Sequence, residues 1–171
     1  MELSFKEKSN YNILCMVETH LRHDKFPIDI NNLHNFNAMR EEGDKKGGGL
    51  KILMEKTKKV EVVMNESKST EILEIEGILF DNKIKIILVY FDVNKDKEAI
   101  NKNNEIRKEI EKKMKKSSGK ALMVLGDFNA HTKILEPDKK ENVNGQIVNK
   151  WIDEFELMIL NEDKKCYGKW K

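Results

Sequence analysis

The first half of the chain is a succession of short apolar runs, and this pattern constrains the fold most. Residues 13–17, 50–54 and 60–64 are apolar or β-branched, and polar, turn-like stretches separate them. Residues 71–78 alternate apolar with charged side chains, and so do residues 83–86, before the chain becomes wholly apolar up to residue 91. A polar pair at residues 81–82 predicts a hairpin turn between the two segments. Such runs are typical of partly buried strands. We therefore expect several β-strands before residue 92.

One helix and one further strand follow this region. Residues 95–116 are rich in lysine and glutamate, and Ile106, Ile110 and Met114 lie four apart, which predicts a narrow apolar stripe on a long solvated helix. Residues 121–125 are an apolar strand, and we expect the chain to leave it at Gly126 because polar residues follow. Strand hairpins together with a strand–helix–strand unit predict an α/β protein built from packed layers.

A second helix is expected towards the end of the chain. Asn144-Gly145 precedes apolar side chains at helical spacing, namely Ile147, Val148, Trp151, Ile152 and Phe155. Trp151 and Phe155 are expected to be core anchors rather than base-stacking residues. The helix is followed by the short apolar run 157–160.

Length and composition limit the class of protein. A chain of 171 residues predicts one domain, and 39% hydrophobic residues support a folded core although 36% are charged. The 32 basic and 30 acidic residues leave a net charge of +2, so any contact with nucleic acid must be local. No apolar signal core or membrane-spanning run occurs, and the two cysteines form no zinc or disulfide pattern. We expect no membrane association and an intracellular location, nuclear or cytoplasmic rather than secreted.

Two apolar runs end abruptly in a carboxylate. Residues 13–17 lead into Glu18, and residues 122–126 lead into Asp127 with Asn129 two positions later. In a chain with 30 acidic residues, either carboxylate alone is best interpreted as a solvated residue after a buried strand. Their combination favours a Mg²⁺ site, because Mg²⁺ binds one or two carboxylates together with water and substrate phosphate. Asn129 would then orient water or phosphate.

The order of four motifs resembles the endonuclease/exonuclease/phosphatase superfamily. The motifs are ILCMVETH at residues 13–20, KKGGGLKILM at 45–54, IILVYF at 86–91 and LMVLGDFNAH at 122–131. The GGG segment, GDFNAH and the run NVNGQIVNKWIDEFELMILN at 142–161 look most like endonuclease domains of non-LTR retrotransposons, which are associated with reverse transcriptase. The resemblance spans nearly all of the chain, and GDFNA is its most specific motif.

This resemblance implies a deoxyribonuclease-I-like fold, a layered α/β/β/α sandwich without its terminal strands, in a single incomplete domain over residues 1–171. Glu18 matches the glutamate that binds the catalytic ion, Mg²⁺ or alternatively Mn²⁺. Tyr90 matches a tyrosine near the scissile phosphate, and Asp127 matches the aspartate that activates or positions the attacking water. Asn129 matches the asparagine that orients phosphate and ion. The implied reaction is in-line attack of water on a phosphodiester of DNA.

The chain also departs from the family pattern at both ends. An asparagine on a first strand and a terminal Ser-Asp-His motif have no counterpart here, and loss of such a group costs about 10²–10⁴-fold in rate. We therefore expect impaired catalysis. The alternatives are a non-catalytic remnant or interaction module, and another phosphodiesterase or phosphatase of the superfamily. Uncovered sheet edges predict a covering chain or self-association.

Several other motifs have simpler explanations. The glycines at residues 47–49 precede a strand, so they predict a turn rather than a phosphate-binding loop. His20 and His23 have no third ligand at zinc spacing. The lysines of residues 112–116 are expected to form a solvated helix end, with DNA contact as the second interpretation. Cys15, in a buried strand, is expected to be inert.

Overall fold

The structure is a computed structural model that describes residues 13–20, 32–38, 49–56, 60–79, 81–93, 96–134 and 139–160. It divides into two compact units, one formed by residues 1–90 and 109–127 and the other by residues 91–108 and 128–171. Each unit is described by itself, and the single domain expected from the chain length stays a prediction. Four residues named above lie outside the described ranges, namely His23, Gly47, Gly48 and Cys166.

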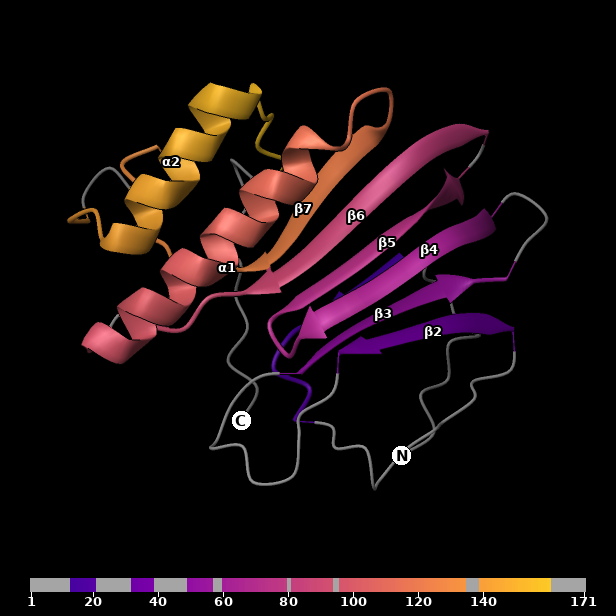
Figure 1. The fold of residues 1–171 in the computed structure, drawn as a ribbon, viewed down its shortest axis with the longest axis horizontal. Helices are drawn as coiled ribbons and strands as arrows, with labels where there is room; N and C mark the ends of the chain where they lie inside the picture. Colours follow the sequence, from indigo (N-terminus) through magenta and orange to yellow (C-terminus); the bar gives the residue numbers. More distant parts are fainter. Residues whose placement is uncertain are drawn as a thin grey trace. The chain divides into compact units, whose positions relative to one another are not determined.

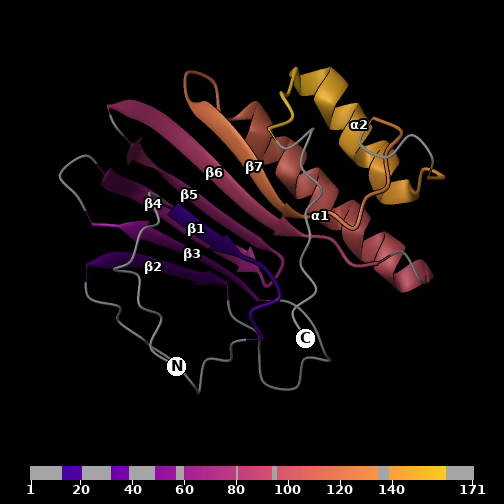
Figure 2. The ribbon, with the colours of Figure 1, turned by 180° about the vertical axis from the view of Figure 1, so that it is seen from behind.

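The first unit contains two β-sheets (Figure 1). One is antiparallel with the order β1-β3-β2, formed by β1 (Ile13–Met16), β2 (Leu33–Ala38) and β3 (Leu50–Glu55). The other has the order β4-β5-β6-β7, formed by β4 (Val60–Ser69), β5 (Ile72–Leu79), β6 (Asn82–Tyr90) and β7 (Ala121–Asp127). Only the β6–β7 pair is parallel among these described strands. Figure 2 shows β1 beside β3 from behind.

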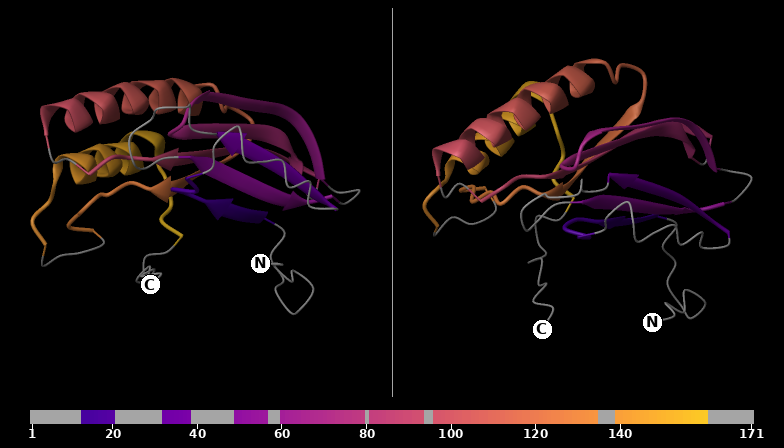
Figure 3. Two further views of the ribbon diagram at one scale, coloured as in Figure 1. Left: turned by 90° about the horizontal axis from the view of Figure 1, so that it is seen from below. Right: turned by 60° about the horizontal axis from the view of Figure 1, so that its bottom comes forward.

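The core of the first unit lies between these sheets, which form separate layers in Figure 3. Because successive side chains of a strand point to opposite faces, alternate residues of β6 meet the core. Ile84, Ile86 and Leu88 pack there with side chains from β2, β3 and β5, namely Ala38, Leu50, Ile52, Met54, Leu73 and Ile75. The strand predicted over residues 83–91 is thus confirmed as β6. The predicted hairpin turn is also confirmed, since Asp81 before β6 has a left-handed backbone with φ of 66°.

The two predicted helices are present, with one boundary corrected. Helix α1 (Lys97–Lys115) buries Ile106, Ile110 and Met114, as their spacing indicated. Helix α2 (Val143–Phe155) begins before Asn144-Gly145 rather than after this pair, because the Asn142 side chain caps it by accepting from the Gly145 amide. Trp151 is buried, as predicted for a core anchor. No helix in the described part of the chain is long and apolar enough to cross a membrane.

The lysine-rich end of α1 is only partly solvated, contrary to expectation. Lys112, Lys115 and Lys116 are exposed, but Lys113 is buried and forms an ion pair with Glu74 of β5. Glu74 also pairs with Lys85 of β6 at 2.7 Å. Since Lys85 alternates with the core-facing residues of β6, it points to the opposite face of the sheet. The end of α1 therefore covers this face through charged groups.

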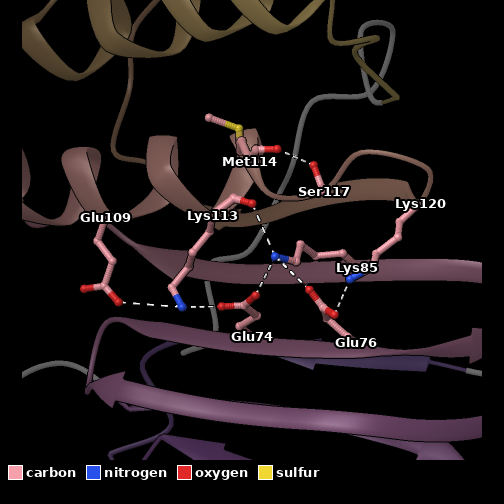
Figure 4. Close-up of polar contacts among 8 residues, drawn as sticks. All are labelled: Glu74, Glu76, Lys85, Glu109, Lys113, Met114, Ser117 and Lys120. Atoms are coloured by element: carbon pink, nitrogen blue, oxygen red, sulfur yellow. Dashed lines mark hydrogen bonds and ion pairs between the residues drawn. The ribbon is translucent and has the colours of Figure 1, made fainter.

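These charges belong to a network centred on Lys85 (Figure 4). The other charged side chains of the network are Glu74, Glu76, Lys113 and Lys120. The Lys85 ammonium lies 2.7 Å from Glu74 and 2.8 Å from Glu76, and it donates to the backbone carbonyl of Lys113 at 3.2 Å. Lys120, just before β7, pairs with the other oxygen of Glu76. Only 3% of the Lys85 side chain is exposed, so its charge depends on these partners.

The network predicts a loss of stability in acid. Burial by itself raises the pKa of Glu76, but hydrogen bonds and charges from Lys120 and Lys85 outweigh it and hold this pKa below 4.5. The unfolded chain then binds more protons as the pH falls below 4.5, so the free energy of unfolding decreases there. Urea unfolding across this range should show the decrease. A Glu76→Gln variant, which cannot titrate, should show a shallower dependence; an equal slope would contradict the assignment to Glu76.

The same network limits stability at high pH. Burial lowers the pKa of Lys85, but Glu74 and Glu76 more than compensate and raise it above 10.5. A raised lysine pKa contributes stability below 10.5, and this contribution is lost as the pH rises through the folded value. The network is therefore fully effective between about pH 4.5 and 10.5.

Candidate active site

Glu18 lies in the segment after β1, and its side chain is held by Tyr90. The Tyr90 hydroxyl donates a hydrogen bond of 2.8 Å to Oε1 of Glu18, across 72 positions of sequence. Glu18 is exposed, and Tyr90 is the last residue of β6. Two residues that the family resemblance assigned to one site are thus in direct contact in the first unit.

The backbone around Glu18 is strained and tethered. Glu18 and His20 both have positive φ, 50° and 53° respectively, a conformation that costs a residue other than glycine roughly 1–2 kcal/mol. The Thr19 amide donates to the Gly49 carbonyl at 3.0 Å, and the Gly49 amide donates to the Thr70 carbonyl at 3.3 Å. These bonds hold the segment that carries Glu18.

Gly49 is needed for close approach to this segment. It has φ of +87°, and a Cβ atom there would lie 2.7 Å from Oγ1 of Thr19. The sequence predicted a turn at residues 47–49. The structure adds that Gly49, the one of the three that it describes, allows Thr19 and the Glu18 segment to pack against the start of β3.

Asp127 lies beside Tyr90 at the end of the parallel strand pair. The register of β6 and β7 pairs Val89 with Gly126 and Tyr90 with Asp127. The expectation that the chain leaves the strand at Gly126 is therefore wrong: β7 continues through Asp127, because Gly126 adopts φ of +144° and lets the backbone stay paired. Asp127 is exposed. The carboxyl ends of β6 and β7 thus place a phenol and a carboxylate next to each other.

Asn129, the fourth predicted residue, belongs to the second unit. Its Nδ2 donates to the Phe91 carbonyl at 2.7 Å, and its backbone is left-handed with φ of 43°. Its own carbonyl accepts from Nδ2 of Asn142 at 2.9 Å. Both the side chain and the main chain of Asn129 are therefore fixed within this unit.

Two buried asparagines near Asn129 were missed from the sequence. Asn103 and Asn144 are 1% and 0% exposed, and the Nδ2 of Asn103 donates to Oδ1 of Asn144 at 3.2 Å. Asn144-Gly145 was placed before the helix, a position that gives an asparagine no reason to be buried. The usable signal was the pair Asn142 and Asn144 at a helix start, where one asparagine is enough for a cap.

The oxygen groups of the first unit fit a hydrated divalent cation. Within the described residues the Glu18 carboxylate receives one hydrogen bond, at Oε1, so its second oxygen can accept a metal ion. Within the described residues, no three or more His, Cys, Asp or Glu side chains lie together in a group that could hold a metal ion. One exposed carboxylate suits Mg²⁺, which retains several waters, and does not suit tetrahedral zinc.

Cys15 of β1 takes no part in this chemistry. Burial raises the pKa of its thiol to about 11, so the thiol stays protonated at neutral pH. Because the thiolate is the nucleophilic form, the thiol is expected to be unreactive.

The sequence of the chain matches a known family. Residues 84–170, half of the chain, match the family described as endonuclease-reverse transcriptase. The chain belongs to this family. The matched range includes Tyr90, Asp127 and Asn129, whereas Glu18 lies before it. No curated protein matches the chain.

Solved structures show the fold of this endonuclease-reverse transcriptase family member. The endonuclease domain of TRAS1, a telomere-specific non-LTR retrotransposon, is similar with a TM-score of 0.60 and 20% identity over 88% of this chain and 61% of that one. The 3′ phosphatase NExo from Neisseria, bound to a product DNA hairpin, is similar with a TM-score of 0.55 and 18% identity over 83% and 60%. TDP2 from C. elegans gives 0.50 and 15% over 71% and 39%.

These likenesses confirm the predicted α/β, deoxyribonuclease-I-like fold. The family match confirms the predicted superfamily. The chain spans about three-fifths of the length of the TRAS1 domain and of NExo. Members of the superfamily generally depend on a divalent metal ion.

Proposed function

We propose that this chain is a Mg²⁺-dependent phosphodiester hydrolase that acts on DNA, as the endonuclease part of a retrotransposon-type protein. The observation that carries the proposal is the hydrogen bond from Tyr90 to Glu18, with Asp127 paired to Tyr90 in the sheet. Membership of the endonuclease-reverse transcriptase family supports the reaction, and the DNA hairpin bound by NExo supports the substrate.

Glu18 would hold the metal ion, and each other residue has a separate task in the proposal. When bound, Mg²⁺ supplies positive charge that neutralises a non-bridging phosphate oxygen. Tyr90 fixes the rotamer of Glu18 through its hydroxyl. Asp127 is exposed and ends a rigid strand, so it can accept the proton of the attacking water. Asn129 is proposed to orient the phosphodiester through its side-chain amide, the role that the family resemblance assigns to it.

Nicking of supercoiled plasmid by the purified protein tests the proposal. We expect slow nicking with Mg²⁺, in line with the impaired catalysis expected from the sequence, and none with EDTA. Asp127→Ala should reduce the rate by a further factor of about 10²–10⁴, because it removes the proposed base. Asp153→Ala is the matched control, since Asp153 is an exposed aspartate of α2 outside the proposed site. Equal nicking by wild type and Asp127→Ala would assign the activity to a contaminant. A folded wild type that does not nick would contradict the proposal for this chain and favour the non-catalytic alternative.

A further inference from the structure

Asn144 is completely buried, and its side-chain amide nitrogen binds the loops that follow β6 and β7. Its Nδ2 lies within hydrogen-bond distance of three backbone carbonyls, 3.0 Å from Phe128, 3.2 Å from Asp92 and 3.4 Å from Asn129. Its Oδ1 accepts from Asn103. The helix does not need this residue as a cap, because Asn142 already caps α2. The bonds of Asn144 therefore serve the two loops.

Two further asparagines complete the arrangement, and we call Asn103, Asn142 and Asn144 the asparagine clamp. Asn103 binds both backbone groups of Asp92: its Oδ1 accepts from the amide at 3.0 Å, and its Nδ2 donates to the carbonyl at 2.8 Å. Asn142 donates to the Asn129 carbonyl at 2.9 Å and accepts from the backbone amide two residues later, that of His131, at 3.0 Å. Every member thus binds backbone of the segments that follow β6 and β7: Asn103 at Asp92, and Asn142 at Asn129 and His131.

The clamp coincides with a strained backbone. Asn129 has φ of 43°, and its Nδ2 reaches the Phe91 carbonyl, next to the clamped Asp92. Residues other than glycine keep such a conformation only when their surroundings fix it. The carbonyl of Asn129 receives Nδ2 groups from both Asn142 and Asn144. The clamp therefore fixes the orientation of the Asn129 side chain through its main chain.

Apolar packing in the second unit comes from aromatic side chains and not from the clamp. Phe91, Phe128 and Trp151 form three aromatic contacts with ring centroids 5.8–6.3 Å apart. Such contacts bury apolar surface without requiring a buried amide. A buried polar network is costly unless every member is satisfied, and it then specifies one arrangement. The clamp thus fixes the backbone around Asn129, in a unit whose apolar packing comes from the aromatic side chains.

We infer that Asn144 is a positioning residue for Asn129. This inference rests on the proposed function, in which Asn129 orients the phosphodiester. Catalysis of in-line attack depends on placement, and a displacement of about 1 Å can cost roughly 10²-fold in rate. Asn144 is fully buried and binds backbone carbonyls and the Asn103 side chain, so it acts through Asn129 and not on the substrate.

Asn144→Asp tests the inference with Asn149→Ala as its matched control. The aspartate keeps the size and the acceptor of Asn144 but removes the Nδ2 donor. Asn149 is another asparagine of α2 and is half-buried, but its Nδ2 donates to Glu141 instead of the loops. Asn144→Ala, which introduces no buried charge, is the second variant if the aspartate prevents folding.

Two readouts separate this inference from the proposed function. In ¹⁵N NMR, hydrogen exchange of the Asn129 side-chain amide and the His131 backbone amide should become about 10-fold faster in Asn144→Asp and stay unchanged in Asn149→Ala. In plasmid nicking, kcat should fall by about 10–10²-fold while KM for DNA stays within about twofold. The exchange result decides the clamp even if the wild type does not nick, which would contradict only the proposed function.

Unchanged exchange at Asn129 and His131 would overturn the inference. A loss of folding in both Asn144 variants would also overturn it, because the role of Asn144 would then be structural alone. Faster exchange without a change in kcat, in a wild type that nicks, would show that the fixed orientation of Asn129 is not used in catalysis and would overturn the positioning role.

Discussion

Replacing Lys85 by methionine is expected to lower the free energy of unfolding by about 3 kcal/mol. Methionine replaces the apolar stem of lysine without its ammonium group, and it leaves the carboxylate of Glu74, whose side chain is 3% exposed, with one cation fewer. Removal of one partner from a buried ion pair usually costs about 3–5 kcal/mol, because a buried charge is left uncompensated. We expect a loss at the lower end of this range because Lys113 and Lys120 still pair with Glu74 and Glu76. Urea unfolding at neutral pH measures the change.

The control for Lys85→Met is an ion pair of the same chemistry at the surface. Lys150 and Glu154 of α2 lie 3.3 Å apart, and both side chains are 48% exposed. Exposed pairs contribute about 0–1 kcal/mol, so Lys150→Met should change stability by less than about 1 kcal/mol. The Lys85 effect should also persist in salt, since buried pairs are screened little. If both variants lost equally little stability, the network would have no structural role.

The sequence predicted the strands with regular patterns and missed those without one. The alternation of residues 83–86 and the apolar run that follows predicted β6, because both patterns are typical of strands. Strand β2 was missed, because Leu33–Ala38 interleaves two asparagines and a histidine with its apolar residues. Its pairing with β3 gives those residues a place in the sheet. Pairing partners are distant in sequence and leave no local pattern.

The predicted site was limited in the same way. Glu18 and Asp127 could be proposed because a carboxylate after an apolar run is a local feature. The register that pairs Tyr90 with Asp127, and the hydrogen bond from Tyr90 to Glu18, depend on contacts across the sheets. Asn144 was missed, because a single asparagine at a helix start predicts an exposed cap or turn, and only its pairing with Asn142 hinted at a second role. Its burial depends on the two loops that it binds.

Replacing Gly126 by alanine is expected to cost at least about 3 kcal/mol of stability and to abolish nicking. Gly126 has φ of +144°, and a Cβ atom there would lie 1.8 Å from the carbonyl oxygen of Val89. That oxygen belongs to the backbone of the paired strand, so no change of rotamer relieves the clash. β7 must separate from β6 at this point, and Asp127, the next residue, must lose its position beside Tyr90.

Gly119→Ala separates the steric part of this effect from the backbone part. Gly119 also has positive φ, +75°, but nothing lies within 4 Å of its hypothetical Cβ atom. Its replacement should therefore cost only the conformational strain, about 1–2 kcal/mol, and leave nicking unchanged. Equal losses in the two variants would mean that strain alone is responsible and that β7 tolerates a Cβ at residue 126. A larger loss for Gly126→Ala would show that the close approach to Val89 keeps Asp127 in the sheet. The glycine of GDFN would then be required for the geometry of the strand end rather than for contact with a ligand.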